Sequence, residues 1–290
     1  MKNFTILLFS IIVLTSCRQQ REEIVITDIP SASLSVAESE DFFNLNLKDS
    51  PLKNDFILSA IDSIEFLPLE TTENSIIGKI GSVDFVDDYV IVSDAQAPGK
   101  VYAFKSDGSF SHPIGSIGEG AGEYSSANQV FSANNKIHIY DWKLSKLFIY
   151  NVDGTFISSI DFSKPTSPQN IYPIGSEYYI GTYAGYFKYN PFEIRIYNSS
   201  DSITATGLPF KYTRPTPSGN IIEDNSKRHL YYTQLSDTIY NVTDTTLCAV
   251  GALGLFTNGE VDEFMKKTSS LDKKDSIKAL YTPSDNEMVN

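Results

Sequence analysis

Acidic and aromatic side chains that could bind or hydrolyse a sugar stand where predicted strands end. Asp94 ends the run YVIVSD, and Asp141 ends the run KIHIYD and is followed by Trp142, the only tryptophan of the chain. Two carboxyl groups in one cleft can cleave a glycosidic bond, and an exposed aromatic ring can stack on a sugar. Asp94, Asp141 and Trp142 are therefore candidate site residues, although turn acids and packing aromatics also occupy such positions.

A second aromatic group follows in the segment 183–189. Tyr183, Tyr186, Phe187 and Tyr189 flank Gly185 there. The same two interpretations apply, a ligand surface or hydrophobic packing between repeats. Tyr183 and Tyr186 join the candidate binding residues.

Other catalytic and metal-binding patterns are missing from the sequence. The three histidines, His112, His138 and His229, show no metal-ligand spacing such as HExxH, and no GxSxG or cysteine-nucleophile motif occurs. The run GSIGEGAGEY at 115–124 lacks the GK[ST] ending of a phosphate loop and contains two glutamates, so it is expected to form a turn. The sequence predicts no catalytic residue, metal or cofactor.

The elements that must position these side chains are strands in a repeat. KVYAFKSDGSF at 100–110 returns as KLFIYNVDGTF at 146–156, and weaker copies cover 177–203 and 229–247. A repeat of about 43–47 residues built from alternating strands and turns is typical of propeller blades. We predict an all-β chain, a β-propeller of four-stranded blades over 58–250, with about four blades visible and Asp-Gly two-residue hairpin turns.

The N-terminus predicts export and lipid anchoring. One lysine precedes the apolar run from Phe4 to Leu14, and small residues then lead to Cys17. This pattern predicts a lipoprotein signal peptide at 1–16 and acylation of Cys17, whose acyl chains would anchor the protein in a membrane. Arg18 follows Cys17 where an inner-membrane lipoprotein of enteric bacteria often carries Asp, so the resemblance to a lipoprotein signal implies the outer membrane of a Gram-negative cell envelope.

Two segments flank the predicted blades. Residues 17–57 read as a tether that also supplies a possible closing strand, and residues 251–290 as an atypical, partly helical tail. The net charge of −13 argues against nucleic acid as a partner, because such binders need a basic face.

Residues 110–156 resemble an NHL-type repeat: a glycine-rich turn, a strand ending in Asp, and KLFIYNVDGTF. Together with PLETTENSIIGKI at 68–80, this repeat is similar to the six-bladed β-propeller lipoproteins of Bacteroides and its relatives, over roughly residues 24–250. The resemblance implies an exported scaffold and about two further blades, so a C-terminally truncated product is one interpretation of the tail.

The leading hypothesis is a lipid-anchored envelope propeller that binds a protein partner or a glycan without catalysis. The alternatives are a carbohydrate-active hydrolase or lyase with carboxylates at the channel mouth, and a degenerate remnant without a function of its own.

Overall fold

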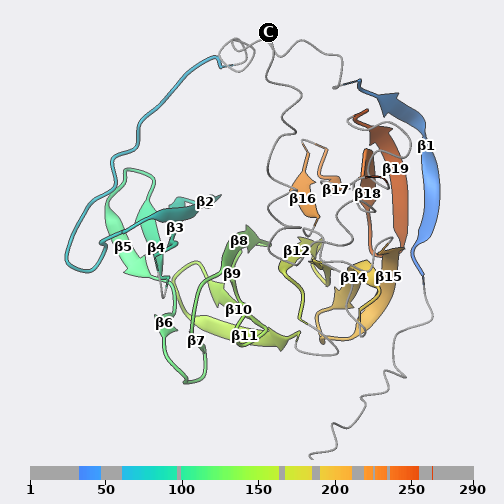
Figure 1. The fold of residues 1–290 in the computed structure, drawn as a ribbon. Coiled ribbons are helices and arrows are strands. Elements are labelled where there is room, and N and C mark those ends of the chain that lie inside the picture. Colours follow the sequence, from blue (N-terminus) through green and yellow to red (C-terminus); the bar gives the residue numbers. More distant parts are fainter. Residues whose placement is uncertain are drawn as a thin grey trace, which may run out of the picture.

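The computed structural model describes residues 33–46, 61–96, 99–162, 167–184, 190–210, 219–224, 226–233, 236–254 and 263. The described residues form a nearly all-β chain of strands β1 to β19, as the sequence predicts (Figure 1). The predicted signal peptide, Cys17, Tyr186 and most of the predicted tail lie outside the described residues.

The first two four-stranded sheets follow the two closest copies of the repeat. Blade 1 consists of β2 (Ile80–Val86), β3 (Tyr89–Asp94), β4 (Val101–Lys105) and β5 (Phe110–Pro113). Blade 2 consists of β8 (Gln129–Ala133), β9 (Lys136–Asp141), β10 (Lys146–Asn151) and β11 (Phe156–Asp161). Between them, the glycine-rich run forms a turn closed by β6 (Ser116–Ile117) and β7 (Glu123–Tyr124), which pair in parallel.

The weaker copies form two further sheets. Blade 3 consists of β12 (Asn170–Ile174), β13 (Tyr178–Thr182), β14 (Phe192–Asn198) and β15 (Ile203–Pro209). Blade 4 consists of β16 (Asn220–Glu223), β17 (His229–Tyr232), β18 (Thr238–Val242) and β19 (Thr246–Ala252), and β1 (Ser35–Asn44) adds a fifth strand parallel to β19. Each blade runs antiparallel from an inner strand outward, which is the order of a propeller.

The number of blades differs from the six that the resemblance implies. The described residues form four blades, arranged in a propeller-like arc that runs from blade 1 at the left of Figure 1 to blade 4 at the right. Residues 63–72, at the start of the predicted propeller span 58–250, form no strand. The end of this segment packs on blade 1 instead, because Glu70 donates its backbone N–H to the carbonyl oxygen of Gly108 and accepts the N–H of Phe110 on its carboxylate.

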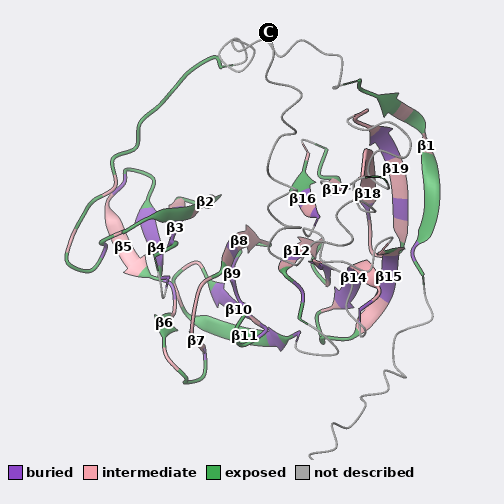
Figure 2. Ribbon diagram, viewed as in Figure 1, coloured by how far each residue is buried: buried purple, intermediate pink, exposed green. Residues whose placement is uncertain are grey.

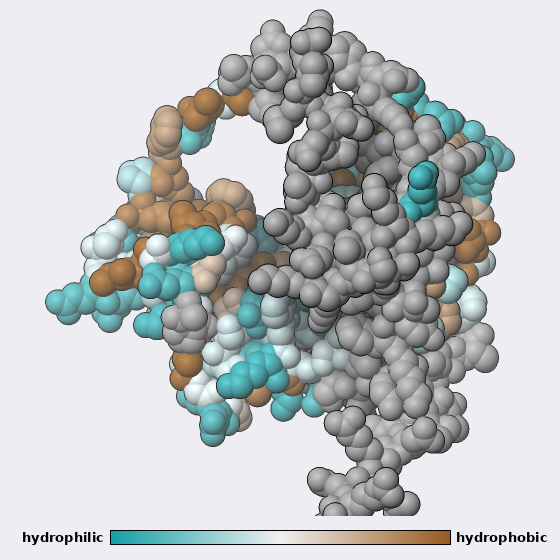
Figure 3. Space-filling view, in the orientation of Figure 1, coloured by the Kyte–Doolittle hydropathy of each residue, from teal (hydrophilic) through white to brown (hydrophobic). Residues whose placement is uncertain are grey.

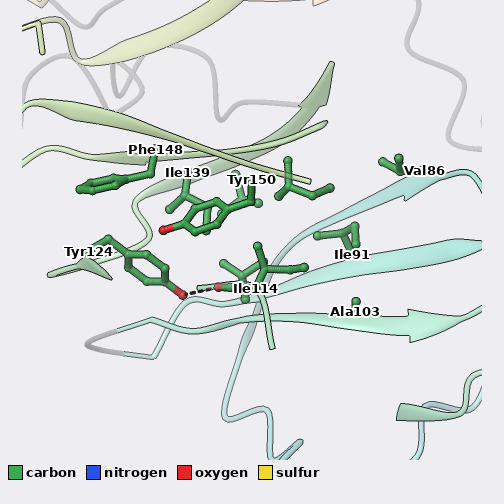
Figure 4. Close-up of a cluster of buried hydrophobic side chains, with 11 residues drawn as sticks. Val86, Ile91, Ala103, Ile114, Tyr124, Ile139, Phe148 and Tyr150 are labelled. Carbon is green, nitrogen blue, oxygen red and sulfur yellow. Dashed lines mark hydrogen bonds between the residues drawn. The ribbon is translucent and has the colours of Figure 1, made fainter. Parts of the chain in front are cut away.

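Neighbouring blades bury apolar faces against each other, as strand alternation requires. Separate buried clusters join blade 1 to blade 2, blade 2 to blade 3, and blade 3 to blade 4. Figure 4 shows the first of these clusters, in which Ile91 and Ala103 of blade 1 meet Ile139 and Tyr150 of blade 2. Figure 2 shows the buried strands in the middle of the blades and the exposed outer strands β1 and β11.

Side chains on the inner strands also fix one blade to the next through backbone groups. The amide of Gln129 in β8 both donates to the carbonyl oxygen and accepts from the N–H of Ile171 in β12, at 2.7 and 2.9 Å. Asp84 in β2 accepts the N–H of Ser132 in β8 at 2.6 Å. These bonds set the register between adjacent blades, a task that apolar packing alone performs poorly.

The Asp-Gly hairpins are tight, but the two-residue turn predicted for them is wrong. In blade 1, Gly108 donates to the carbonyl oxygen of Lys105 and Lys105 donates to that of Ser109, so the loop has three residues, 106–108. Only the glycine takes a positive φ, +85° at Gly108 and +84° at Gly154. Asp107 keeps an ordinary φ and accepts the N–H and hydroxyl of Ser109, which closes an Asx turn.

Replacing Gly108 with alanine is expected to lower the free energy of unfolding by about 2 kcal/mol. A side chain is strained at φ +85°, and its Cβ would lie 2.1 Å from the carbonyl oxygen of Pro68. Urea denaturation measures the change. The control is Asp201→Gly at the corresponding turn of blade 3, where φ is +65° and glycine also fits, so stability should stay within about 0.5 kcal/mol. An equal loss in both variants would contradict the explanation.

Candidate functional site

Three of the predicted site residues hold the same structural position in successive blades. Each lies opposite the start of the third strand of its blade. Asp94 donates its backbone N–H to the carbonyl oxygen of Lys100, just before β4, and Tyr183 donates to that of Glu193, the second residue of β14. Asp141 pairs with Lys146, the first residue of β10. The repeat therefore places Asp94, Asp141 and Tyr183 at the same end of blades 1, 2 and 3. We call this end, where the second strand of each blade ends, the loop end.

Asp141 is buried and organises the loop that precedes its blade. Its Oδ2 accepts the backbone N–H groups of Ser125 and Ser126 at 2.6 and 3.0 Å and the hydroxyl of Ser125 at 2.7 Å. Its Oδ1 accepts the N–H of Leu144 at 3.1 Å. Burial raises the pKa of Asp141, but these hydrogen bonds outweigh burial and leave the pKa below the ordinary aspartate value.

Asp94 does the same in blade 1. Its carboxylate accepts the backbone N–H groups of Gly78, Lys79 and Gln96 at 2.9 to 3.0 Å. Burial raises its pKa, and the three amides and the charge of Lys100 bring it below the ordinary value. Both aspartates are thus charged loop anchors.

Tyr183 takes this position in blade 3 with different chemistry. It is buried, its hydroxyl is hydrogen-bonded to the hydroxyl of Tyr197, and the guanidinium of Arg195 lies over its ring, 5.0 Å from the ring centre. Burial raises its pKa well above the ordinary value, so the phenol stays neutral. A ring enclosed in this way cannot stack on a ligand.

Trp142 differs from these three residues because 49% of its surface is exposed. It begins the turn between β9 and β10, and its backbone N–H donates to the side-chain oxygen of Asn128 at 2.9 Å. Ser145, at φ +56°, closes the turn by donating its N–H to the carbonyl oxygen of Trp142. Asp141 holds the turn from beneath through Leu144, so its backbone is fixed before any ligand arrives.

The residues next to Trp142 on this turn are also exposed. Lys143 and Leu144 are both exposed, and 37% of the surface of Leu144 is accessible to solvent. A tryptophan, a cation and an aliphatic side chain on a rigid turn form a compact contact surface. We call residues 142–144 the tryptophan turn.

A groove of about 580 Å³ lies at the loop end of blade 1. Its walls come from the start of β4, from β5, from β6 and from the segment before β2, and include Asn74, Lys100, Tyr102, Phe110, His112 and Tyr124. The phenol groups of Tyr102 and Tyr124 donate to the carbonyl oxygens of Ile76 and Ile114, so both hydroxyls are already hydrogen-bonded within the protein. The size of the groove suits a small ligand.

The histidines serve packing and turn contacts. His112 has Nε2 2.9 Å from the carbonyl oxygen of Val152, and His138 is buried between blades 2 and 3, stacked on Phe131. His229 lies 3.9 Å from the carboxylate of Glu223. Within the described ranges, no cluster of three or more His, Cys, Asp or Glu side chains could bind a metal, and no helix is long and apolar enough to cross a bilayer.

Trp142 was a candidate from the sequence, but Asn128 and Ser145, which fix its turn by hydrogen bonds, were not. The sequence likewise gave no indication of Ser125 and Ser126, whose backbone N–H groups donate to the carboxylate of Asp141. The sequence did contain one sign that Asp141 binds its own loop. Asp94 and Asp141 recur at the same point of the repeat, and a recurrent residue is more often structural than catalytic.

Comparison with known proteins gives a family and a fold. The model of a domain of unknown function, DUF4934, matches residues 43–287. No curated protein sequence matches the chain.

Among solved structures, a protein of Bacteroides fragilis NCTC 9343 described as exported is 21% identical, with a TM-score of 0.61, over 81% of this chain and 65% of its own length. A member of the DUF4221 family from Bacteroides vulgatus ATCC 8482 is 11% identical, with a TM-score of 0.45, over 64% of this chain and 61% of its own length. The chain spans 65% of the length of the Bacteroides fragilis protein, and at 21% identity this likeness shows the fold alone.

Proposed function

The chain belongs to the DUF4934 family, whose function is unknown. From the geometry of the tryptophan turn we propose that it is a non-catalytic binding module of the cell envelope that holds a neutral glycan on this turn. The observation that carries the proposal is a half-exposed tryptophan on a backbone already fixed by Asn128, Ser145 and Asp141. A pre-organised aromatic surface loses little entropy on binding. A neutral ligand is favoured because the chain carries a net charge of −13.

The lowered pKa values and the hydrogen bonds of Asp94 and Asp141 support binding over hydrolysis. A glycosidase needs one carboxylic acid with a raised pKa to protonate the leaving group and a second carboxylate free to act. Asp94 and Asp141 both have lowered pKa values, and backbone amides occupy their oxygens. Neither is suited to donate a proton at neutral pH.

Glycan binding is expected to change the fluorescence of the protein directly, because Trp142 is its only tryptophan. Titration with neutral oligosaccharides should shift the emission to shorter wavelength with a saturating curve as the ring leaves water. Trp142→Ala should abolish binding measured by calorimetry, with Phe156→Ala, another exposed aromatic of blade 2, as the matched control. Unchanged affinity in Trp142→Ala would place the ligand elsewhere, with the groove of blade 1 as the next place to test.

A protein partner is the second candidate, and the exposed Leu144 beside Lys143 favours it. Protein contacts concentrate their binding energy in tryptophan and aliphatic anchors, whereas a sugar gains little from an exposed leucine. Leu144→Ser should therefore leave glycan affinity unchanged but weaken a protein complex about tenfold or more.

Lipid anchoring through Cys17 is part of the proposal, and its support is the apolar run and small residues before that cysteine. The full chain expressed in a Gram-negative host should incorporate labelled palmitate and fractionate with the outer membrane. Cys17→Ser should lose the label and leave the precursor unprocessed. Label retained in the variant, or a labelled protein confined to the inner membrane, would contradict this assignment.

A further inference from the structure

The groove at the loop end of blade 1 differs in its chemistry from the tryptophan turn. Its volume of about 580 Å³ lies within the range of small-molecule sites. None of the described residues that line it belongs to the tryptophan turn. Blade 1 lies at the left of Figure 3, where hydrophobic side chains adjoin hydrophilic ones on the visible face. A ligand in the groove would therefore be recognised by other groups than a glycan on Trp142.

Aromatic side chains give the groove an ordered apolar lining. Tyr102 and Tyr124 are almost fully buried, and the rings of Tyr102 and Phe110 lie edge to face with their centres 6.1 Å apart. Phe110 is only partly buried and Ile117 is exposed, so both can contact a ligand. Removing such surface from water favours a ligand with an apolar group.

Most polar side chains of the groove are hydrogen-bonded within the protein. The two phenol hydroxyls donate to backbone carbonyl oxygens. His112 donates from Nε2 to the carbonyl oxygen of Val152, which leaves Nδ1 of the neutral ring to accept the hydroxyl of Ser111, each at 2.9 Å. The hydroxyl of Ser116 donates to the carboxylate of Glu123 at 3.3 Å. These bonds hold the lining in place and leave recognition to the remaining polar groups.

The polar side chains that remain carry one positive charge, one negative charge and one neutral amide. They belong to Lys100, Glu73 and Asn74, all of which are exposed. None of these three side chains forms a hydrogen bond or an ion pair with another described residue. A ligand with a single sign of charge would be attracted by one of the two ions and repelled by the other, whereas a zwitterion can pair with both.

We propose that the groove of blade 1 binds a small zwitterion with an apolar group, of the class of an apolar α-amino acid or a short peptide. Its carboxylate pairs with Lys100, its ammonium with Glu73, and its apolar group covers Phe110 and Ile117. The amide of Asn74 adds a neutral hydrogen bond. Because internal hydrogen bonds already fix the lining, binding orders few groups besides these charged side chains.

Isothermal titration calorimetry with L-phenylalanine, glycine and the dipeptide leucyl-phenylalanine tests the proposal. Saturable binding of phenylalanine or of the dipeptide is expected, and glycine should bind at least about tenfold more weakly because it lacks the apolar group. Lys100→Met and Glu73→Gln should each weaken binding about fivefold or more. The matched controls are Lys105→Met, also exposed on β4, and Glu119→Gln, exposed in the glycine-rich turn, and both should keep the wild-type affinity.

Two blocked ligands test which charge meets which residue. N-acetylphenylalanine lacks the ammonium and phenylalaninamide lacks the carboxylate, so both should bind more weakly than phenylalanine. Glu73→Gln should no longer weaken binding of the first, nor Lys100→Met binding of the second. Circular dichroism confirms that each variant is folded.

Three results would overturn the proposal. The first is no saturable binding of phenylalanine or the dipeptide up to about 10 mM. The second is an affinity that neither Lys100→Met nor Glu73→Gln changes, which would place the ligand outside the groove. The third is N-acetylphenylalanine bound as tightly as phenylalanine, which would leave Glu73 without a part in recognition.

Discussion

Acidification from pH 6.5 to about 4 should lower the free energy of unfolding by about 3 kcal/mol through His138 alone. Burial between blades 2 and 3 lowers the pKa of this histidine to about 4, against 6.5 when unfolded. The unfolded chain therefore binds the proton first as the pH falls. Stability that is full above pH 6.5 is lost progressively down to the folded pKa.

The measurement is urea denaturation at intervals between pH 7.5 and 5, a range in which aspartates contribute little. His138→Phe should flatten this part of the profile and raise stability at neutral pH, because phenylalanine can stack on Phe131 and removes a buried Nδ1 that has no hydrogen-bond partner. His229→Gln, at the partly exposed histidine of blade 4, is the control and should keep the slope. A slope that persists in His138→Phe would show that His138 is not its source.

Replacing Asp141 with alanine should lower the free energy of unfolding by about 3 kcal/mol or more. The substitution removes the acceptor of three backbone N–H groups and of the Ser125 hydroxyl, in a position where water does not reach. The same change should loosen the tryptophan turn, and faster hydrogen exchange at Leu144 would report it.

Asp153→Ala is the matched control, because Asp153 accepts hydrogen bonds from Thr155 but is exposed, and its loss should change stability far less. Because the pKa of Asp141 is lower in the folded protein than in the unfolded chain, its contribution to the free energy of unfolding depends on pH. Its stabilising contribution is complete above the ordinary value of 3.8 and is lost as the pH falls through the lower folded value. A mild effect of Asp141→Ala would mean that the loop holds its shape without the carboxylate.

The blades could be predicted from the sequence because the signal is local and repeated. The pairs 100–110 and 146–156 align residue by residue, and alternation within each strand marks which side chains are buried. The hairpin type was harder to predict, since Asp-Gly fits two loop lengths and the register shift beside Phe104 depends on strand twist.

The candidate site could be predicted only in part, because its character depends on contacts distant in the chain. Nothing near Asp141 in sequence shows that the amides of Ser125 and Ser126 would occupy it, and nothing near Tyr183 shows that Tyr197 and Arg195 would enclose it. Trp142 shows the converse. Its residue type was visible at once, but its exposure follows from how the turn is held.

In the proposed function, Asp94 and Asp141 hold a binding surface in place and do not perform chemistry. Incubating the purified protein with fluorescently labelled neutral oligosaccharides, while following both product release and Trp142 emission, distinguishes binding from hydrolysis. We predict saturable binding at Trp142 with no product over many hours. Product that forms with wild-type protein and disappears in a folded Asp94→Asn or Asp141→Asn variant would contradict it and establish a carbohydrate-active enzyme.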